Sequence, residues 1–285
     1  MNATLQVHVE QPALGIIAGA GALPRMMMKA CAQMGRPFFV VALEGAADDE
    51  TIYDAGEAVA WARVGAIGKI IELLHENQVS EIVLAGKVPR PKITSLRPDM
   101  KGTKLLARVG GQLITGDNDL LNNIVTFIEE EGFRVIGADQ VMRELLAPEG
   151  LIGSIYPDKR AQADIEFGAR IAREIGALDI GQAVVVQNQT VIGVEAIEGT
   201  DKLIERCGYL KIEDRGGVLV KVKKPQQDTR VDLPTIGIPT IEKLAAAGLA
   251  GIAVEAGATL IIDRRELARK ADQLGIFVIG FSILE

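Results

Sequence analysis

The chain has 285 residues, of which 48% are hydrophobic, a mean hydropathy of +0.21 and a formal net charge of −7. Its length exceeds that of a usual single domain, so two domains are expected, and its acidic balance argues against general nucleic-acid binding, which needs a basic surface. No apolar run reaches the roughly 20 residues that span a bilayer, and Met1–Pro12 lacks the basic start and the apolar stretch of a signal peptide.

The first half of the chain alternates strand and helix signals. A short apolar run ends in Gly19-Ala20-Gly21, and Pro24 opens a helical stretch because proline is tolerated at a helix start. The predicted elements are strand Leu14–Ala18, helix Pro24–Met34, strands Phe38–Leu43 and Ala58–Val64, helix Ile67–Glu76, strand Glu81–Ala85, helix Asp117–Glu130 and strand Phe133–Ile136. This order predicts an α/β fold, a Rossmann-like parallel sheet covered by helices on both faces.

The pattern breaks where Pro148, Gly150, Gly153 and Pro157 lie close together. We therefore predict an N-terminal domain over residues 1–146, a linker over 147–159 and a C-terminal α/β domain over 160–285, to which the motifs below assign nucleotide binding and catalysis, respectively. The elements predicted there are helix Ala161–Ile175, strands Ala183–Val186, Val191–Ala196 and Val218–Val222, helix Ile241–Ala247, strands Gly251–Glu255 and Thr259–Ile262, helix Arg265–Leu274 and strand Phe277–Ile279. Because two strands adjoin at Glu255–Thr259, we expect a mixed sheet.

Histidine and cysteine are scarce. With only two histidines, His8 and His75, a His-rich zinc site is nearly excluded, and nothing near His75 supports a Ser-His-Asp or Cys-His arrangement. The two cysteines, Cys31 and Cys207, lie far apart, which is typical of a reducing compartment, so we expect a soluble cytoplasmic protein. Hydrolytic chemistry would then depend on carboxylates, Lys and Arg, and a hard cation such as Mg²⁺.

The glycine-rich run after the first strand has the context of a phosphate-binding loop. Gly19, Ala20, Gly21 and Ala22 follow a strand and open a helix, so their backbone could hold a nucleotide. Pro24 stands where the dinucleotide fingerprint needs a third glycine, so NAD is not favoured. The alternative is a tight turn without a ligand.

A second loop leaves a neighbouring strand at the same predicted edge of the sheet. It carries Lys87, Val88 and Arg90, and the two cations could contact an anion. Asp117, which opens a later helix, could hold a ribose or simply cap the helix. For Lys87 and Arg90 the alternative is a solubilising charged loop.

The stretch Lys224–Gly237 is the most informative part of the chain. It combines Lys224, Gln227, Arg230, Asp232 and Thr235 with prolines that stiffen the backbone. Carboxylates beside Lys and Arg suit a metal ion together with a polyanion, usually a phosphate ester. A solvated loop between strands is the competing interpretation.

Carboxylates also gather at a strand-to-helix junction that contains Glu195, Glu198, Gly199, Thr200 and Asp201. Glu195 is expected inside an apolar strand, where an unpaired carboxylate would be costly, so we predict a partner cation or a ligand for it. Glu255, which ends another apolar strand, raises the same expectation.

With these motifs in order, the chain resembles the LpxI-type UDP-2,3-diacylglucosamine pyrophosphatases of lipid A biosynthesis. The resemblance is carried by residues Gly19–Pro24, Ala85–Pro91, Asp179–Gln182, Glu195–Asp201 and Lys224–Gly237, which span nearly the whole chain in the order of the family. It implies Mg²⁺-dependent hydrolysis of UDP-2,3-diacylglucosamine to UMP and 2,3-diacylglucosamine 1-phosphate (lipid X), with water attacking the β-phosphorus. It also implies a UDP-binding N-terminal domain, contact with the inner-membrane surface through the lipid substrate, and a homodimer.

The resemblance also assigns roles to individual residues. The aspartate whose loss disables family members aligns with Asp232, which would bind Mg²⁺ or orient the attacking water. Lys224 and Arg230 would neutralise the diphosphate and the charge on the departing UMP. Glu195 and Glu255 are further candidate metal ligands.

The substrate would be contacted by residues from both domains. The candidates are Gly19, Ala20, Gly21, Ala22, Lys87, Val88, Arg90, Asp117, Glu198, Gly199, Thr200, Asp201, Gln227 and Thr235. Two other classes of function remain open at this point: a non-catalytic protein that binds sugar nucleotides or lipid, and an NAD-dependent oxidoreductase, which the lack of a hydride-transfer histidine disfavours.

Overall fold

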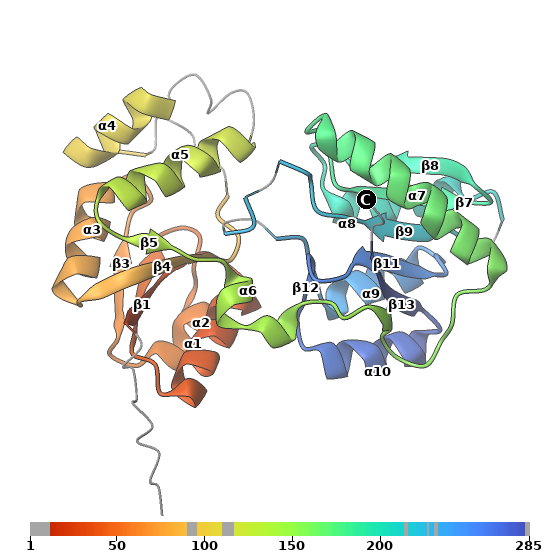
Figure 1. Cartoon of the computed structure of the whole chain (residues 1–285), viewed down its shortest axis with the longest axis horizontal. Helices are drawn as coiled ribbons and strands as arrows, with labels where there is room; N and C mark the ends of the chain where they lie inside the picture. The colour runs from red at the N-terminus through yellow and green to blue at the C-terminus, as the bar shows by residue number, and fades with distance from the viewer. Residues whose placement is uncertain are drawn as a thin grey trace, which may run out of the picture. The chain divides into compact units, whose positions relative to one another are not determined.

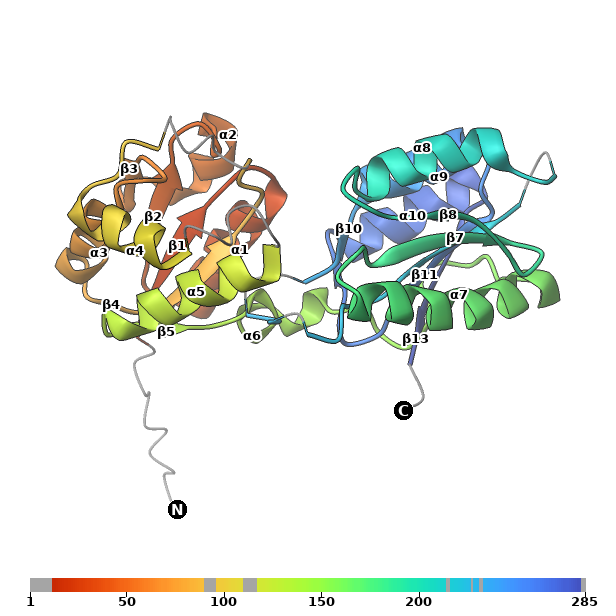
Figure 2. The same cartoon turned by 90° about the horizontal axis from the view of Figure 1, so that it is seen from above.

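A computed structural model describes residues 12–89, 96–109, 117–213, 216–226, 228–230 and 233–282. The chain divides into two compact units, Met1–Met142 and Arg143–Glu285. Each unit has its own sheet (Figures 1 and 2). The described residues include no helix with both the length and the apolar character that crossing a membrane requires.

The first unit is built around a parallel sheet with the strand order β3-β2-β1-β4-β5. Its elements are β1 (Ala13–Ala18), α1 (Ala22–Met34), β2 (Phe38–Leu43), α2 (Asp49–Ile52), a 3₁₀ turn (Tyr53–Ala55), β3 (Val59–Ala62), α3 (Ile67–Glu76), β4 (Val79–Ala85), α4 (Met100–Val109), α5 (Asp117–Glu130), β5 (Arg134–Val135) and α6 (Ala138–Val141). This arrangement confirms the predicted Rossmann-like sheet.

Helices cover both faces of the first sheet (Figure 1). Helix α1 contacts both α2 and α6, and α4 contacts both α3 and α5 in a second group. The central strand β1 is apolar throughout, as a strand buried on both faces must be. Gly15 has no side chain because a Cβ there would lie 2.7 Å from Leu74 of α3 and 2.8 Å from Val79. Close packing of α3 against β1 therefore requires glycine at this position.

The second unit has a six-stranded sheet with the order β6-β13-β11-β9-β7-β8 and a two-stranded sheet of β10 and β12. Its elements are a 3₁₀ turn (Arg143–Leu145), β6 (Gly150–Leu151), α7 (Lys159–Ala177), β7 (Ala183–Gln187), β8 (Thr190–Val194), α8 (Thr200–Leu210), β9 (Val218–Lys221), β10 (Thr235–Ile236), α9 (Ile238–Ala246), β11 (Gly251–Glu255), β12 (Leu260–Ile261), α10 (Arg264–Leu274) and β13 (Phe277–Phe281).

Helices cover both faces of the six-stranded sheet (Figure 2), and each face carries a separate apolar core. On one face, Leu219 and Val254 pack with residues of α8, α9 and α10 such as Leu203. On the other face, Val220 and Ala253 pack with residues of α7. Alternate residues of each strand point to opposite faces, so neighbouring positions in β9 belong to different cores.

The predicted mixed sheet is confirmed, but the reason offered for it was wrong. β12 does not join β11 in the six-stranded sheet and pairs with β10 instead. The sheet is mixed because β7 runs antiparallel to both β8 and β9, and β6 runs antiparallel to β13. Residues 147–159, predicted as a linker, contain β6, which pairs with the last strand of the second unit.

Helix α4 went unpredicted because it lies between two stretches rich in polar and turn-forming residues. Glu195 was also expected inside a strand, whereas β8 ends at Val194. Its amide nevertheless donates to the carbonyl of Ala183 at 2.8 Å, so Glu195 continues the backbone pairing just beyond the strand.

A buried carboxylate holds the turn between β7 and β8. Asp164 of α7 is 4% exposed, and its two oxygens accept hydrogen bonds from the amides of Asn188 at 3.1 Å and Gln189 at 2.6 Å. Asn188 and Gln189 both have positive φ, 53° and 56°, as a two-residue type I′ hairpin turn requires. Asp164 thus stabilises a strained turn from the helix packed beneath it.

We expect Asp164→Ala to lower the free energy of unfolding by about 1–3 kcal/mol, because both turn amides lose a charged acceptor. The measurement is urea unfolding followed by circular dichroism. Glu166→Ala is the matched control, since Glu166 lies exposed on the same helix. Equal stability of the two variants would contradict this role of Asp164.

Both cysteine thiols are free and buried, Cys31 in the first unit and Cys207 in the second. Burial raises the pKa of the Cys31 thiol, and burial raises the pKa of Cys207 from 9.0 to about 11. The folded state holds the Cys207 proton more tightly than the unfolded state does. The stability that this tighter protonation contributes is fully present below pH 9.0 and is lost as the pH rises through about 11.

We expect alkylation of the native protein by iodoacetamide at about pH 8 to be at least about 10-fold slower than alkylation in denaturant, because the reactive thiolate is scarce and enclosed. Mass spectrometry of each cysteine peptide measures the two rates. Fast native labelling of Cys207 would show that the thiol is accessible and its pKa is not raised.

Candidate functional site

Two loops meet at the carboxyl edge of the first sheet. They follow β1 and β4, the adjacent strands where the strand order changes direction, which is where open α/β sheets bind ligands. The amide of Ala20 donates to the carbonyl of Lys87 at 2.9 Å, and the amide of Lys87 donates back to Ala20 at 2.8 Å. The structure therefore brings the Gly19–Ala22 loop and the Lys87–Val88 segment together.

Glycine is needed on both sides of this contact. A Cβ at Gly19 would lie 2.5 Å from the carbonyl oxygen of Lys87, and a Cβ at Gly86, whose φ is +91°, would lie 2.6 Å from the carbonyl oxygen of Ala20. Lys87 and Val88 remain exposed beside the contact. The two loops form one backbone-paired surface with a lysine at its rim.

The amino terminus of α1 opens at the same edge. Gly21 precedes the helix with no side-chain cap, and no acidic residue lies in the first turn. The unpaired amides and the helix dipole at such an end attract an anion. Glu44 follows the neighbouring strand β2 and is exposed there, where it could accept a ribose hydroxyl.

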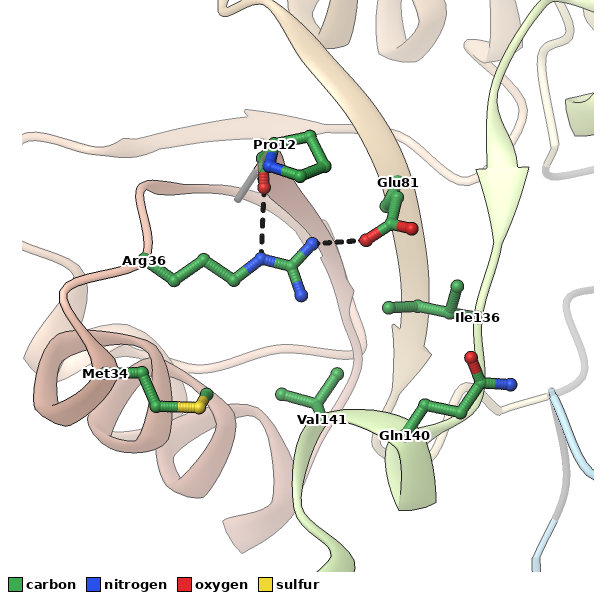
Figure 3. Close-up of a pocket in the computed structure, with 7 residues that line it drawn as sticks. All are labelled: Pro12, Met34, Arg36, Glu81, Ile136, Gln140 and Val141. Atoms are coloured by element: carbon green, nitrogen blue, oxygen red, sulfur yellow. Dashed lines mark hydrogen bonds and ion pairs between the residues drawn. The ribbon is translucent and has the colours of Figure 1, made fainter. Parts of the chain in front are cut away.

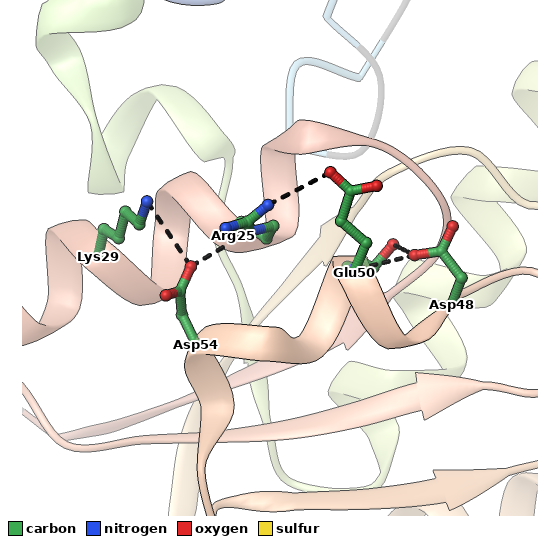
Figure 4. Close-up of polar contacts among 6 residues, drawn as sticks. Arg25, Lys29, Asp48, Glu50 and Asp54 are labelled. Carbon is green, nitrogen blue, oxygen red and sulfur yellow. Dashed lines mark hydrogen bonds and ion pairs between the residues drawn. The ribbon is translucent and has the colours of Figure 1, made fainter.

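The cations of α1 itself are already paired with carboxylates (Figure 4). Arg25 lies 3.2 Å from Asp54 and 3.5 Å from Glu50, and Lys29 lies 3.7 Å from Asp54. These pairs hold the first turns of α1 against α2 and the 3₁₀ turn after it. Arg90 lies outside the described residues, as does the side chain of Asp117, whose backbone begins α5.

A second group of predicted residues meets at one edge of the six-stranded sheet. The parallel strands β9 and β11 end there, at Lys221 and Glu255. Because β7 is antiparallel to β9, with Ala183 opposite Lys221, the start of β7 and the end of β8 reach the same edge. This register places Glu195 and the start of the Lys224–Gly237 stretch at one edge of the sheet.

Glu195 is the centre of a buried polar network. It is 6% exposed, and its Oε1 accepts the hydroxyl of Thr200 at 2.6 Å while its Oε2 accepts the amide of Gln182 at 3.0 Å. The Nζ of Lys221, which is 7% exposed, donates to the Thr200 hydroxyl at 3.0 Å. Glu195 thus accepts hydrogen bonds from a hydroxyl and a backbone amide of the second unit, and the nearby cation Lys221 is connected to it through the Thr200 hydroxyl.

The two acidic residues of the Glu198–Asp201 segment form ion pairs with other residues of the protein. Arg206 donates to Glu198 at 2.9 Å, and this hydrogen bond holds the pKa of Glu198 below its ordinary value. Asp201 pairs with Lys243. Gly199, with a φ of 78°, precedes α8 without a side-chain cap. What this segment presents to a ligand is therefore the backbone at the start of α8.

The cations of the Lys224–Gly237 stretch are oriented by carboxylates. Lys224 Nζ donates to Asp179 at 2.7 Å, and Arg230 donates through Nε and Nη2 to Asp228 at 2.7–3.0 Å. The Arg230 hydrogen bonds hold the pKa of Asp228 below its ordinary value. Gln227 and Asp232 lie outside the described residues.

The beginning of this stretch is tied to the sheet edge and to α7, and its end forms strand β10 of the two-stranded sheet. The amide of Lys223, just before it, donates to Glu255 at 2.8 Å, and the side chain of Gln226 donates to the carbonyl of Gly176 at 2.8 Å. Thr235 is exposed in β10 and donates to the carbonyl of Leu233 at 3.0 Å. The stretch therefore leaves the sheet edge at a defined position and returns through β10.

The described carboxylates do not form a metal centre by themselves. Both oxygens of Glu195 accept hydrogen bonds and a lysine is close by, while Glu255 accepts a backbone amide. Within the described ranges, no three His, Cys, Asp or Glu side chains are grouped as a metal site would need. The candidate ligand Asp232 lies outside these ranges.

Sequence reasoning missed the role of Lys221 and the partner carboxylates Asp179 and Asp228. A signal for Lys221 was available, because it is the charged residue in the apolar run Val218–Val222. Gln182, quoted only as part of a motif, joins the Glu195 network through its backbone.

A cavity of about 300 Å³ lies elsewhere in the first unit and includes no predicted site residue. Arg36 lines it near the amino ends of β1 and β2 and donates to the Pro12 carbonyl at 3.0 Å and to Glu81 at 2.6 Å (Figure 3). The remaining lining residues are Met34, Ile136, Gln140 and Val141. Because it lies near the amino ends of the strands, this cavity is distinct from the loops at the carboxyl edge of the same sheet.

Comparison with solved structures adds no argument about function. N5-carboxyaminoimidazole synthase from Aspergillus clavatus matches with 10% identity over 72% of this chain and 45% of its own, at a TM-score of 0.24.

Comparison with known sequences finds a family match for each half of the chain. The LpxI N-terminal domain matches residues 13–145 and the LpxI C-terminal domain matches residues 148–279. A Caulobacter vibrioides protein named UDP-2,3-diacylglucosamine pyrophosphatase LpxI is 43% identical over 273 residues, which cover 94% of this chain and 96% of that protein. With both domains present in order and this identity over nearly its whole length, the chain belongs to the LpxI family.

Proposed function

We propose that this protein hydrolyses UDP-2,3-diacylglucosamine to UMP and lipid X in lipid A biosynthesis. The observation that carries the proposal is the 43% identity, over 94% of the chain, to a relative named for this pyrophosphatase activity. The site geometry supports it, because each unit has a sheet edge at which the backbone of a helix start and a nearby cation could receive a phosphate-bearing ligand.

The nucleotide end of the substrate is assigned to the first unit. The amides at the start of α1 are available to a phosphate, and the Gly19–Ala22 loop would face the ribose or the uracil. Lys87 and Val88 lie exposed beside this loop, so they would line the same ligand. The pairing of the two loops means that the surface is formed before the substrate arrives.

The diphosphate is assigned to Lys224 and Arg230. Their carboxylate partners, Asp179 and Asp228, hold the two cations in defined orientations, and the planar guanidinium of Arg230 is fixed by more than one hydrogen bond. Positive charge placed in advance stabilises the negative charge that grows on the departing UMP. Asp232 would orient the water that attacks the β-phosphorus.

Mg²⁺ dependence is part of the proposal through the resemblance to the family. A bound Mg²⁺ would neutralise diphosphate charge, but the described carboxylates do not form its site, so no step of the reaction is assigned to it here. Cytoplasmic location, contact with the inner membrane through the acyl chains of the substrate, and a homodimer are proposed on the same basis.

We expect the purified protein to release UMP from UDP-2,3-diacylglucosamine in Mg²⁺ and to lose this activity in excess EDTA. In ¹⁸O-water, the label should enter lipid X, because attack on the β-phosphorus leaves the new oxygen on the sugar phosphate. Mass spectrometry of both products measures this. Label in UMP would overturn the position of attack, and tight substrate binding without UMP release would favour a non-catalytic binding protein.

We expect Asp232→Asn to lower kcat by about 100-fold or more while substrate binding is retained, because the neutral amide cannot orient the attacking water as the carboxylate does. Steady-state kinetics and equilibrium binding of the substrate measure the two effects. The control is Glu166→Gln, which removes an exposed carboxylate from α7. Full activity of Asp232→Asn would remove Asp232 from the proposed mechanism.

A further inference from the structure

Lys221 is a buried lysine at the point where the sheet gives way to the Lys224–Gly237 stretch. It ends β9 with 7% of its surface exposed. By strand alternation it shares a face with Leu219, which packs in the core under α8. This face explains why its ammonium reaches Thr200 in the first turn of α8.

The position is electrostatically unfavourable for a lysine alone. The amino end of a helix carries partial positive charge, which repels a cation. Glu195 supplies the opposite charge through Thr200, whose single hydroxyl proton goes to Glu195 at 2.6 Å while its oxygen accepts from Lys221 at 3.0 Å. The hydroxyl therefore connects an ammonium and a carboxylate in one defined direction.

The chain of contacts joins the segments that form this edge of the sheet. The amide of Gln182 donates to Glu195, and the carbonyl of Gln182 accepts the amide of Val222 at 3.0 Å. Residues before β7, after β8, at the start of α8 and after β9 are thus held by one network. The backbone of the first turn of α8 and the origin of the Lys224–Gly237 stretch cannot shift independently of each other.

Stability alone does not account for these charges. Replacing a buried ion pair by apolar side chains of similar volume is often neutral or stabilising, because two desolvation costs disappear. The surrounding strand Val218–Lys221 is otherwise apolar, so an apolar residue would suit position 221 as far as packing is concerned. A role in positioning explains why a lysine stands there.

We propose that Lys221, Thr200 and Glu195 form a charge-bridging chain that aligns the start of α8 with Lys224 for the diphosphate. Lys221 is a positioning residue in this arrangement, and Glu195 is joined to it through Thr200 rather than acting as a metal ligand. The inference rests on the proposed pyrophosphatase function. On this proposal, the contacts among Lys221, Thr200 and Glu195 affect catalysis more than they affect the stability of the fold.

The test compares Lys221→Met, Glu195→Gln and the double variant, with Lys159→Met as a control because Lys159 is exposed at the start of α7. We expect Lys221→Met to lower the urea midpoint, because Thr200 loses a charged donor while Glu195 stays buried. The double variant should lose less stability than the sum of the two single variants, because the two groups are joined through Thr200. Its kcat should nevertheless stay at least about 10-fold below wild type with KM changed less than about 3-fold, the signature of lost transition-state alignment.

Thr200 supplies a second test that keeps both charges. Thr200→Ser retains the bridging hydroxyl and should keep more of the wild-type kcat than Thr200→Val, which has similar volume without it. A stable double variant with wild-type kcat, or equal kcat for the two Thr200 variants, would overturn the positioning role while leaving the pyrophosphatase intact. Absence of turnover by the wild-type protein would overturn the proposed function itself, and the positioning role with it.

Discussion

The second unit depends on a balance of two buried charges. Glu195 and Lys221 are each more than nine-tenths buried, and each hydrogen-bonds to the hydroxyl of Thr200. Their connection through Thr200 fixes where α8 begins, and the pairing of Gln182 with both Glu195 and Val222 fixes how the strands end. The Lys224–Gly237 stretch begins just after these contacts at the end of β9. The contacts therefore help to set the position of Lys224, which pairs with Asp179.

The two units achieve a comparable arrangement by different physical means. In the first unit, backbone amides and carbonyls of Ala20 and Lys87 pair directly, and glycines provide the space. In the second unit, side chains of opposite charge perform the joining. Backbone pairing suits a loop whose amides face a ligand, whereas a charged network creates a strong local field. The difference is consistent with a nucleotide on one unit and diphosphate chemistry on the other.

Much of the fold could be predicted from the sequence because its signals are local. The strands Phe38–Leu43 and Gly251–Glu255 and the helix Ile67–Glu76 occur at the predicted residues, since continuous apolar runs and helical periodicity need no tertiary information. The pairing of β12 with β10 could not be predicted, because partner choice depends on long-range topology. For the same reason, the lysine in β9 could be noticed in sequence but its partner Thr200 could not.

The reciprocal contact between Gly19 and Gly86 has a consequence for how the first unit can vary. A Cβ on Gly19 would run into the backbone of Lys87, and a Cβ on Gly86 would run into the backbone of Gly19 and Ala20. The close approach of the loops after β1 and β4 therefore depends on both positions, although they are distant along the chain. A larger residue at either would require the opposite loop to be rebuilt.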